Sequence, residues 1–169
     1  EAASAYLAVP AGTRNFKVNA TGTTTTVIDA DVAVTSGSYY TVMATGPVAS
    51  IQPLVLTDDL TNPAAGNVKV RLVHGAPSAP NVDIYVTAPG ADISMMAPTL
   101  TDVPFRGYSD YLEVPAGSYQ VRITPTGTKT VALDTGALAV AAGQIRTGVA
   151  LDATGGGTPF GAIVLADEN

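Results

Sequence analysis

The stretch Tyr111-Leu-Glu-Val-Pro-Ala-Gly117, which continues as Ser-Tyr-Gln-Val-Arg-Ile123, decides the fold because the chain contains it twice. The other copy reads Tyr6-Leu-Ala-Val-Pro-Ala-Gly12 and continues as Thr-Arg-Asn-Phe-Lys-Val18. In each copy a short apolar run meets a Pro-Ala-Gly turn, in which proline presets φ and glycine allows a positive φ. We therefore expect Tyr6–Val9 to be a short strand. The copies lie roughly 100 residues apart, about the length of one small β-domain, so the chain is a tandem repeat.

On both sides of these copies, the chain consists of short segments of strand character separated by turns. Apolar and polar residues alternate with a period of two in most of them, and no segment shows a sustained helical period. The clearest segments are 16–18, 39–44, 51–56, 68–72, 82–86 and 119–123. Glycine and proline separate them at short intervals. The sequence predicts an all-β protein, an immunoglobulin-like antiparallel β-sandwich.

The two copies of the repeat are unequal in length. The run 58–66, Asp-Asp-Leu-Thr-Asn-Pro-Ala-Ala-Gly, has the composition of a linker. We predict an incomplete N-terminal repeat at 1–60, a linker at 61–67 and a complete repeat at 68–169. The second copy has a front half, roughly Asn67 to Asp110, before its Tyr-Leu stretch, whereas the first has only Glu1–Ala5. The first copy therefore lacks about three strands of a sandwich.

Three explanations of the half repeat remain open. The chain is a fragment, or another chain supplies the missing strands by β-augmentation, or the first half adds its strands to the second domain. The chain begins at Glu1 rather than Met, so we expect a processed product from which a leader has been removed.

Composition narrows the class of protein. Of 169 residues, 46% are hydrophobic and only 13% are charged, about half the usual charged share. Thr, Ser, Gly and Ala must then face water, which is typical of secreted and surface β-proteins. The net charge is −6 and the basic residues are scattered, which disfavours nucleic acid as a partner. There is no cysteine, so no disulfide or thiolate site exists. No apolar run is long enough to cross a membrane.

The alternating segments 68–72 and 82–86 predict two half-buried strands. Val68, Val70 and Leu72 would face the core while Lys69 and Arg71 face solvent. If the two strands pair, Arg71 and Asp83 meet across them on the polar face.

The run Val70-Arg-Leu-Val-His-Gly-Ala-Pro-Ser-Ala-Pro-Asn-Val-Asp-Ile-Tyr-Val86 resembles the signature of the family known as domain of unknown function 4397. The later Tyr111–Val121 stretch resembles the second signature of the same family, in the right order. The resemblance implies tandem β-sandwiches in exported or surface proteins, with no established catalytic residues. The positions that carry it are expected to be structural: His74, Pro77, Pro80, Asp83, Tyr85, Pro115 and Gly117.

Several residues could carry chemistry, and each also has a structural explanation. His74, the only histidine, could be a general base or a metal ligand, but a hydrogen bond within its proline-rich loop is the favoured reading. Asp83 could be a metal ligand or a catalytic acid. The favoured structural explanation is that it pairs with Arg71 or caps the loop. The pairs Asp58-Asp59 and Asp167-Glu168 could bind calcium, but their spacing fits no calcium loop, and solvated strand ends are favoured.

Three further features each have a functional and a structural explanation. The seven tyrosines could form a sugar-stacking platform, with Tyr85 and Tyr108 expected to be exposed, but without any Trp, packing is favoured. Gly155–Gly157 is expected to be a flexible hairpin loop rather than a phosphate cradle. Asn19-Ala-Thr21 is an N-glycosylation sequon. The sequence predicts no catalytic, cofactor or metal site.

These observations predict a non-enzymatic structural module, secreted or on the cell surface, that self-associates through strand edges as a filament or surface-layer subunit. The alternative is a module that binds carbohydrate or cell-wall polymer through exposed tyrosines. A hydrolase is the third reading, and it lacks a recognisable nucleophile motif.

Overall fold

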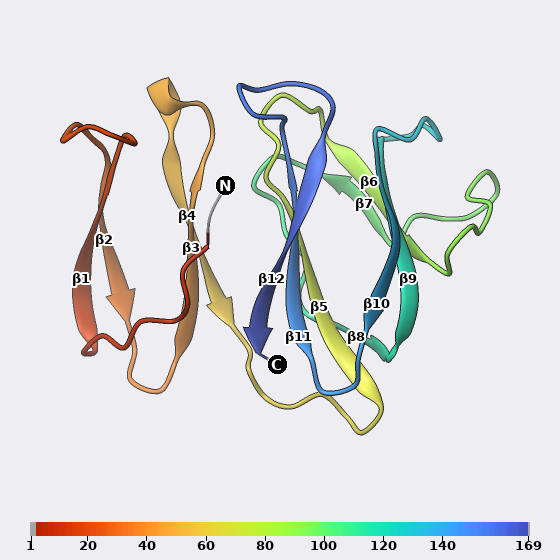
Figure 1. The fold of residues 1–169 in the computed structure, drawn as a ribbon, viewed down its shortest axis with the longest axis horizontal. Helices are drawn as coiled ribbons and strands as arrows, with labels where there is room; N and C mark the ends of the chain where they lie inside the picture. The colour runs from red at the N-terminus through yellow and green to blue at the C-terminus, as the bar shows by residue number, and fades with distance from the viewer. Residues whose placement is uncertain (1–2, 169) are drawn as a thin grey trace. The chain divides into compact units, whose positions relative to one another are not determined.

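The structure is a computed structural model that describes residues 3–168, and its regular elements are strands (Figure 1). In these residues the one helical element is a 3₁₀ turn, η1 (Val48–Ser50), and no helix is long and apolar enough to span a bilayer. The prediction of an all-β protein is confirmed. The strands are β1 (Gly12–Asn19), β2 (Thr26–Val34), β3 (Tyr39–Thr45), β4 (Gln52–Asp58), β5 (Asn67–His74), β6 (Val82–Thr87), β7 (Leu100–Val103), β8 (Leu112–Pro115), β9 (Gly117–Pro125), β10 (Leu133–Val140), β11 (Ile145–Leu151) and β12 (Gly161–Glu168).

The chain forms two compact units, 1–59 and 60–169. The first unit contains two antiparallel hairpins, β1–β2 and β3–β4. On the exposed face of β1–β2, Asn15 donates hydrogen bonds to Asp29 and Asp31 at 2.7 and 2.9 Å, and Lys17 pairs with Asp29 at 3.1 Å. β2 and β4 lie close to each other, and Ile28, Val32, Val34 and Leu56 are the buried apolar side chains.

The second unit has the two facing sheets of a sandwich (Figure 1). One sheet has the strand order β12-β11-β5-β8 and the other β10-β9-β6-β7. The core lies between them, because its buried side chains come from both sheets: Leu72 and Ala150 from the first, and Val82, Ile84, Val103, Ile123 and Leu133 from the second. The two-layer arrangement confirms the sandwich-like class, while the immunoglobulin-like topology remains a prediction.

One strand pair departs from the antiparallel prediction. β5 and β11 run parallel, with Arg71 opposite Thr147 and Val73 opposite Val149. Parallel neighbours need a long crossover connection, and here all the strands from β6 to β10 lie between β5 and β11 in the sequence. Turn signals alone could not reveal this pair, because its partners come from opposite ends of the repeat.

The predicted pairing of segments 68–72 and 82–86 is wrong. β5 and β6 belong to different sheets, so Arg71 and Asp83 do not meet across a ladder. The solvent-facing prediction for Lys69 and Arg71 is also wrong, since both are buried. Lys69 Nζ donates to the carbonyl and the hydroxyl of Thr61 at 2.8 and 2.6 Å, and the Arg71 guanidinium lies over the ring of Tyr111. Alternation of apolar and polar residues shows that a strand has two different faces, but not that one of them is exposed to solvent.

The rear halves of the two repeats share their strand register over most of each hairpin, although β10 and β11 carry register shifts that their equivalents lack. β1 pairs with β2 as β9 pairs with β10, with Gly12 opposite Val34 and Gly117 opposite Val140. β3 pairs with β4 as β11 pairs with β12, with Thr41 opposite Leu56 and Thr147 opposite Leu165. The first unit is therefore built like the rear half of the second.

The predicted strand at Tyr6–Val9 is wrong, because these residues form no strand. The equivalent residues in the second unit form β8, whose partner is β5, with Leu112 opposite Val70 and Val114 opposite Val68. In the described part of the first unit no strand corresponds to β5. A strand needs a ladder partner for its backbone groups, so nearly the same local sequence is irregular in one repeat and a strand in the other.

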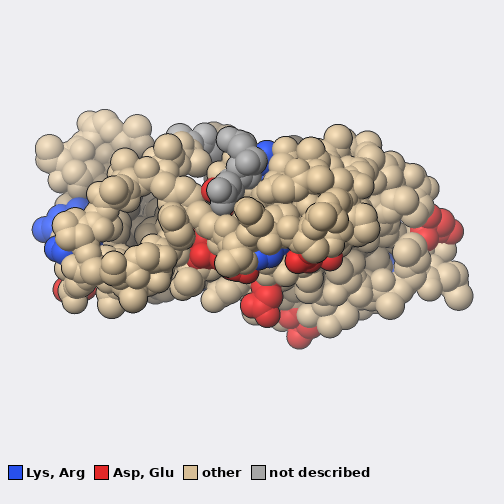
Figure 2. Space-filling view, turned by 90° about the horizontal axis from the view of Figure 1, so that it is seen from below, with Lys and Arg blue, Asp and Glu red and all other residues tan. Residues whose placement is uncertain are grey.

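Figure 2 shows that uncharged side chains cover most of the face in view, with small separate groups of acidic and basic residues. This agrees with the 13% of charged residues in the sequence.

Candidate functional site

A buried polar network links four segments of the second unit. Arg71 on β5 donates from Nε to the Thr147 hydroxyl on β11 at 3.1 Å. Thr147 in turn donates to Oδ2 of Asp167 on β12 at 2.6 Å, and Tyr111, just before β8, donates to the same oxygen at 2.8 Å. The Arg71 guanidinium carbon lies 4.7 Å from the centre of the Tyr111 ring. Each member therefore holds the next, and β5, β8, β11 and β12 are tied at one point.

The members of this network are shielded from water. Arg71, Thr147 and Asp167 are 2%, 0% and 7% exposed. Burial, followed by the hydrogen bond to Asp167, raises the pKa of Tyr111 well above its ordinary value, so this phenol remains a donor at neutral pH. A buried carboxylate is tolerated when hydrogen-bond donors satisfy it. Thr147 and Tyr111 supply two donors here, and Arg71 reaches Asp167 through Thr147.

The first unit contains the same network without the arginine-bearing strand. Tyr6 donates to Oδ2 of Asp58 at 2.6 Å, and Thr41 donates to the same oxygen at 2.8 Å. Tyr6, Thr41 and Asp58 occupy the repeat positions of Tyr111, Thr147 and Asp167. The prediction of solvated strand ends is wrong for both Asp58 and Asp167, which are 5% and 7% exposed. Spacing alone could not reveal their burial, but the recurrence of Tyr and Asp in both copies was a usable signal.

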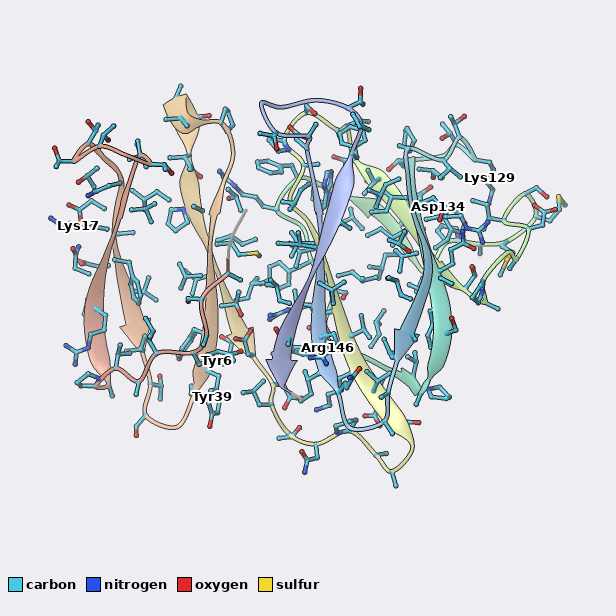
Figure 3. All side chains as sticks on the ribbon, viewed as in Figure 1. Tyr6, Lys17, Tyr39, Lys129, Asp134 and Arg146 are labelled. Carbon is cyan, nitrogen blue, oxygen red and sulfur yellow. The ribbon has the colours of Figure 1, made fainter. Side chains whose placement is uncertain are left out.

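The strand edge beside this trio distinguishes the two units. β11 is paired on both sides, with β12 and with β5. Its equivalent β3 pairs only with β4 within residues 3–168. Beside β3, the Tyr6 and Tyr39 rings meet edge to face at 5.7 Å and are about half exposed (Figure 3). We call the β3 edge, with Tyr6, Thr41 and Asp58, the acceptor edge. It is the candidate functional site.

His74 lies at the end of β5 and is fully enclosed. Its Nε2 donates to the Pro80 carbonyl at 3.1 Å, and its Nδ1 accepts from the Ala76 amide at 3.4 Å, so the Nε2–H tautomer satisfies both contacts. Phe105 packs edge-on against the ring at 6.3 Å. Burial is the main cause that lowers the pKa of His74, so the ring is neutral near pH 7. The imidazole is thus used within the loop that carries Pro77 and Pro80.

Asp83 caps two turns of the backbone. Its Oδ1 accepts from the Asp102 amide and its Oδ2 from the Gly127 amide, both at 2.9 Å. Of the two structural explanations considered, loop capping is the one that the structure has, whereas pairing with Arg71 is not formed. Asp102 needs this support because its φ is 52°, in the left-handed region that few non-glycine residues adopt.

The expectation that Tyr85 is exposed is wrong, while the expectation for Tyr108 is confirmed. Tyr85 is 1% exposed and Tyr108 is 51% exposed. Lys129 covers Tyr85: its Nζ lies 4.6 Å from the ring centre, donates to the phenol oxygen at 2.9 Å and also contacts the Met96 carbonyl. The two tyrosines therefore do not form a shared sugar-stacking platform.

The remaining motif residues lie at turns. Pro115 ends β8, and its carbonyl accepts from the Tyr119 hydroxyl at 2.8 Å. Gly117 opens β9 without a left-handed φ, whereas the equivalent Gly12 has a φ of 110°. Asn19 ends β1 with an exposed side chain that accepts from Thr26. The loop of Gly155–Gly157 joins β11 to β12, and all three glycines have positive φ.

Two hollows lie in the second unit: a small apolar cavity beside His74, and an open groove of about 280 Å³ lined by Leu133, Leu138, Phe160 and Val164, among others. The apolar cavity has a volume of about 40 Å³ and is lined by Val82, Ile123, Leu133 and Phe160, among others. That volume holds at most a few waters, far below the size of a small-molecule site. Among the described residues, no group of three His, Cys, Asp or Glu side chains is placed to hold a metal ion.

The fold defines a tandem-repeat all-β protein with sandwich-like pairs of sheets. The chain belongs to the family described as "Domain of unknown function (DUF4397)", which it matches in two adjacent segments, residues 1–85 and 86–169. Two adjacent matches agree with a tandem repeat and confirm the resemblance seen in the sequence. No curated protein matches the sequence.

Proposed function

We propose that this protein is a non-enzymatic structural module of the cell exterior that assembles through its strand edges, as a subunit of a filament or surface layer. One observation carries the proposal: β3 presents the edge that β11 uses to hold β5, and within residues 3–168 it has no strand on that side. An unpaired edge offers backbone donors and acceptors to another strand, which is the basis of β-augmentation.

Exposed apolar side chains support assembly through the first unit. Leu7, Val9 and Tyr39 are 78%, 49% and 48% exposed, and in the second unit the residues equivalent to Leu7 and Val9 belong to β8 and pair with β5. A further strand would cover side chains of this kind and lower the free energy by removing apolar surface from water.

The non-enzymatic part of the proposal is supported by how the candidate chemical groups are used. Both nitrogens of His74 and both carboxylate oxygens of Asp83 are engaged in hydrogen bonds that hold loops. A group so engaged is poorly placed to exchange protons with a substrate. The exterior location is supported by the low share of charged residues and by the exposed sequon at Asn19.

The test is the mass and assembly state of native material, by intact mass spectrometry, sedimentation and negative-stain microscopy. The proposal expects polymers or a regular lattice that contain the 1–59 unit. Strictly monomeric native protein over the physiological concentration range would overturn the assembly proposal.

The second candidate is a module that binds carbohydrate or cell-wall polymer. The exposed Tyr6–Tyr39 pair and the exposed Tyr108 favour it, because sugars stack on accessible aromatic faces. Native monomers that bind purified cell wall would favour this candidate over assembly.

A further inference from the structure

We infer that the acceptor edge receives, in parallel, a strand with the residue pattern of β5, and that the arginine of this strand lies opposite Thr41. The inference rests on the proposed function and names the partner: a front-half segment of this family, from outside residues 1–169, with the pattern Val-x-Val-Arg-Leu-Val-His. The register follows from the repeat, since Thr147 lies opposite Arg71 in the parallel β5–β11 pair.

The receiving side chains already have the geometry that holds Arg71 in the second unit. Thr41 and Tyr6 donate to one oxygen of Asp58 at 2.8 and 2.6 Å, as Thr147 and Tyr111 donate to one oxygen of Asp167 at 2.6 and 2.8 Å. The Thr41 hydroxyl donates its proton to Asp58, so its oxygen can still accept a hydrogen bond. Thr147 accepts from Arg71 Nε in this way in the second unit. The Tyr6 ring corresponds to the ring over which Arg71 lies.

Arginine suits this position better than an apolar residue or lysine. The site offers a hydroxyl oxygen, a carboxylate and an aromatic face, and a planar guanidinium can serve all three at once. In the second unit the arginine is 2% exposed, so the choice of residue there is governed by buried contacts and not by solubility.

The segment Leu7–Pro10 would become a strand on the far side of the incoming strand. Its equivalent, β8, pairs antiparallel with β5, with Leu112 opposite Val70 and Val114 opposite Val68. The incoming strand would thus be held on both edges, by β3 and by residues 7–10. The folded β5 of a second copy is not the donor, since its own unit buries it, with Val68 and Val73 0% and 2% exposed.

The test uses a fluorescent synthetic peptide of residues 67–87 and the full chain, with binding followed by fluorescence anisotropy. We expect saturable binding that weakens about tenfold when the peptide carries Arg71→Met, the size expected for a hydrogen bond to a charged group. Thr41→Val in the chain should cause a similar loss, and the two changes together little more than either alone. Thr13→Val, an exposed threonine on β1, should leave binding unchanged and is the matched control.

Crosslinking tests the register independently of affinity. The chain has no cysteine, so Met43→Cys in the chain and Val73→Cys in the peptide would be opposed only in the parallel register that Val149 and Val73 have in the second unit. We expect a disulfide with Met43→Cys. Crosslinking to Val149→Cys instead would mean that the peptide exchanges with β5, and would overturn the inference.

The outcomes separate this inference from the proposed function. Equal binding of the Arg71→Met peptide, or no binding while native material polymerises, overturns the inference and leaves assembly standing. If the native chain is monomeric, but the peptide binds with coupled effects of Arg71→Met and Thr41→Val and crosslinks to Met43→Cys, the inference is supported and assembly is overturned as the function.

Discussion

At the scale of single residues, Thr147 is the member of the buried network in the second unit that joins Arg71 to Asp167. Its one hydroxyl accepts from Arg71 and donates to Asp167, and the side chain is fully buried. Removal of this hydroxyl would leave both Arg71 and Asp167 buried without a hydrogen-bond partner that they now have, and this lowers the free energy of unfolding by more than the loss of one hydrogen bond.

We predict that Thr147→Val lowers the free energy of unfolding of the second unit by about 2 kcal/mol, since the volume is kept while two buried polar groups lose a partner. Urea unfolding followed by fluorescence or circular dichroism measures it. Thr130→Val, on an exposed loop, is the control and should stay within about 0.5 kcal/mol of the wild type. Equal stability of the two variants would contradict this account of the network.

We predict that His74 makes the free energy of unfolding fall as the pH is lowered below 6.5. Burial lowers the pKa of His74 in the folded state below the ordinary value of 6.5, so below that pH the unfolded chain binds more protons than the folded one. The stability contributed by the neutral ring is fully present above pH 6.5 and is lost as the pH falls through the folded-state pKa. Unfolding in urea between pH 7.5 and 5.5 should show this decline.

The control for this prediction is His74→Gln, because the chain has no other histidine. Glutamine can still donate to the Pro80 carbonyl but does not titrate. The difference in unfolding free energy between wild type and variant should shrink as the pH falls. A constant difference over this range would contradict the lowered pKa.

At the scale of elements, the repeated Tyr-Leu-x-Val-Pro stretch shows how far a strand depends on its partner. Leu112–Pro115 is a strand because β5 lies beside it, while the matching residues 7–10 form none. Intrinsic β-propensity is almost the same in the two copies, so propensity does not decide the outcome.

We predict that hydrogen–deuterium exchange separates these two segments. Backbone amides in 7–9 should exchange within seconds at neutral pH, since no ladder protects them, and those in 112–114 should exchange at least about a hundredfold more slowly. Exchange read by mass spectrometry on short peptic fragments measures both in one sample. Similar protection of both fragments would contradict the absence of a strand at 7–9.

At the scale of the whole molecule, the front half of the repeat is what makes a complete sandwich. β5, β6 and β7 contribute Leu72, Val82, Ile84 and Val103 to the core of the second unit, more than half of its buried cluster. They also supply one of the two middle strands of each sheet, β5 in one and β6 in the other. The first unit, which has no such strands among the described residues, consists of two hairpins, and hairpins are marginal in isolation. A donor strand would therefore add both ladder partners and core to the first unit, which is why assembly is the function proposed.

The all-β class, the tandem repeat and the family can be predicted from the sequence alone, because strand alternation, turn residues and internal identity are local properties of the chain. The role of His74 within its loop follows from the same local pattern. Only the tertiary structure decided that Arg71, Asp58 and Asp167 are buried, that β5 runs parallel to β11 and that Tyr6–Val9 is not a strand. The physical reason is that burial and pairing depend on strands far away in the sequence. A period of two identifies the faces of a strand but not what covers them.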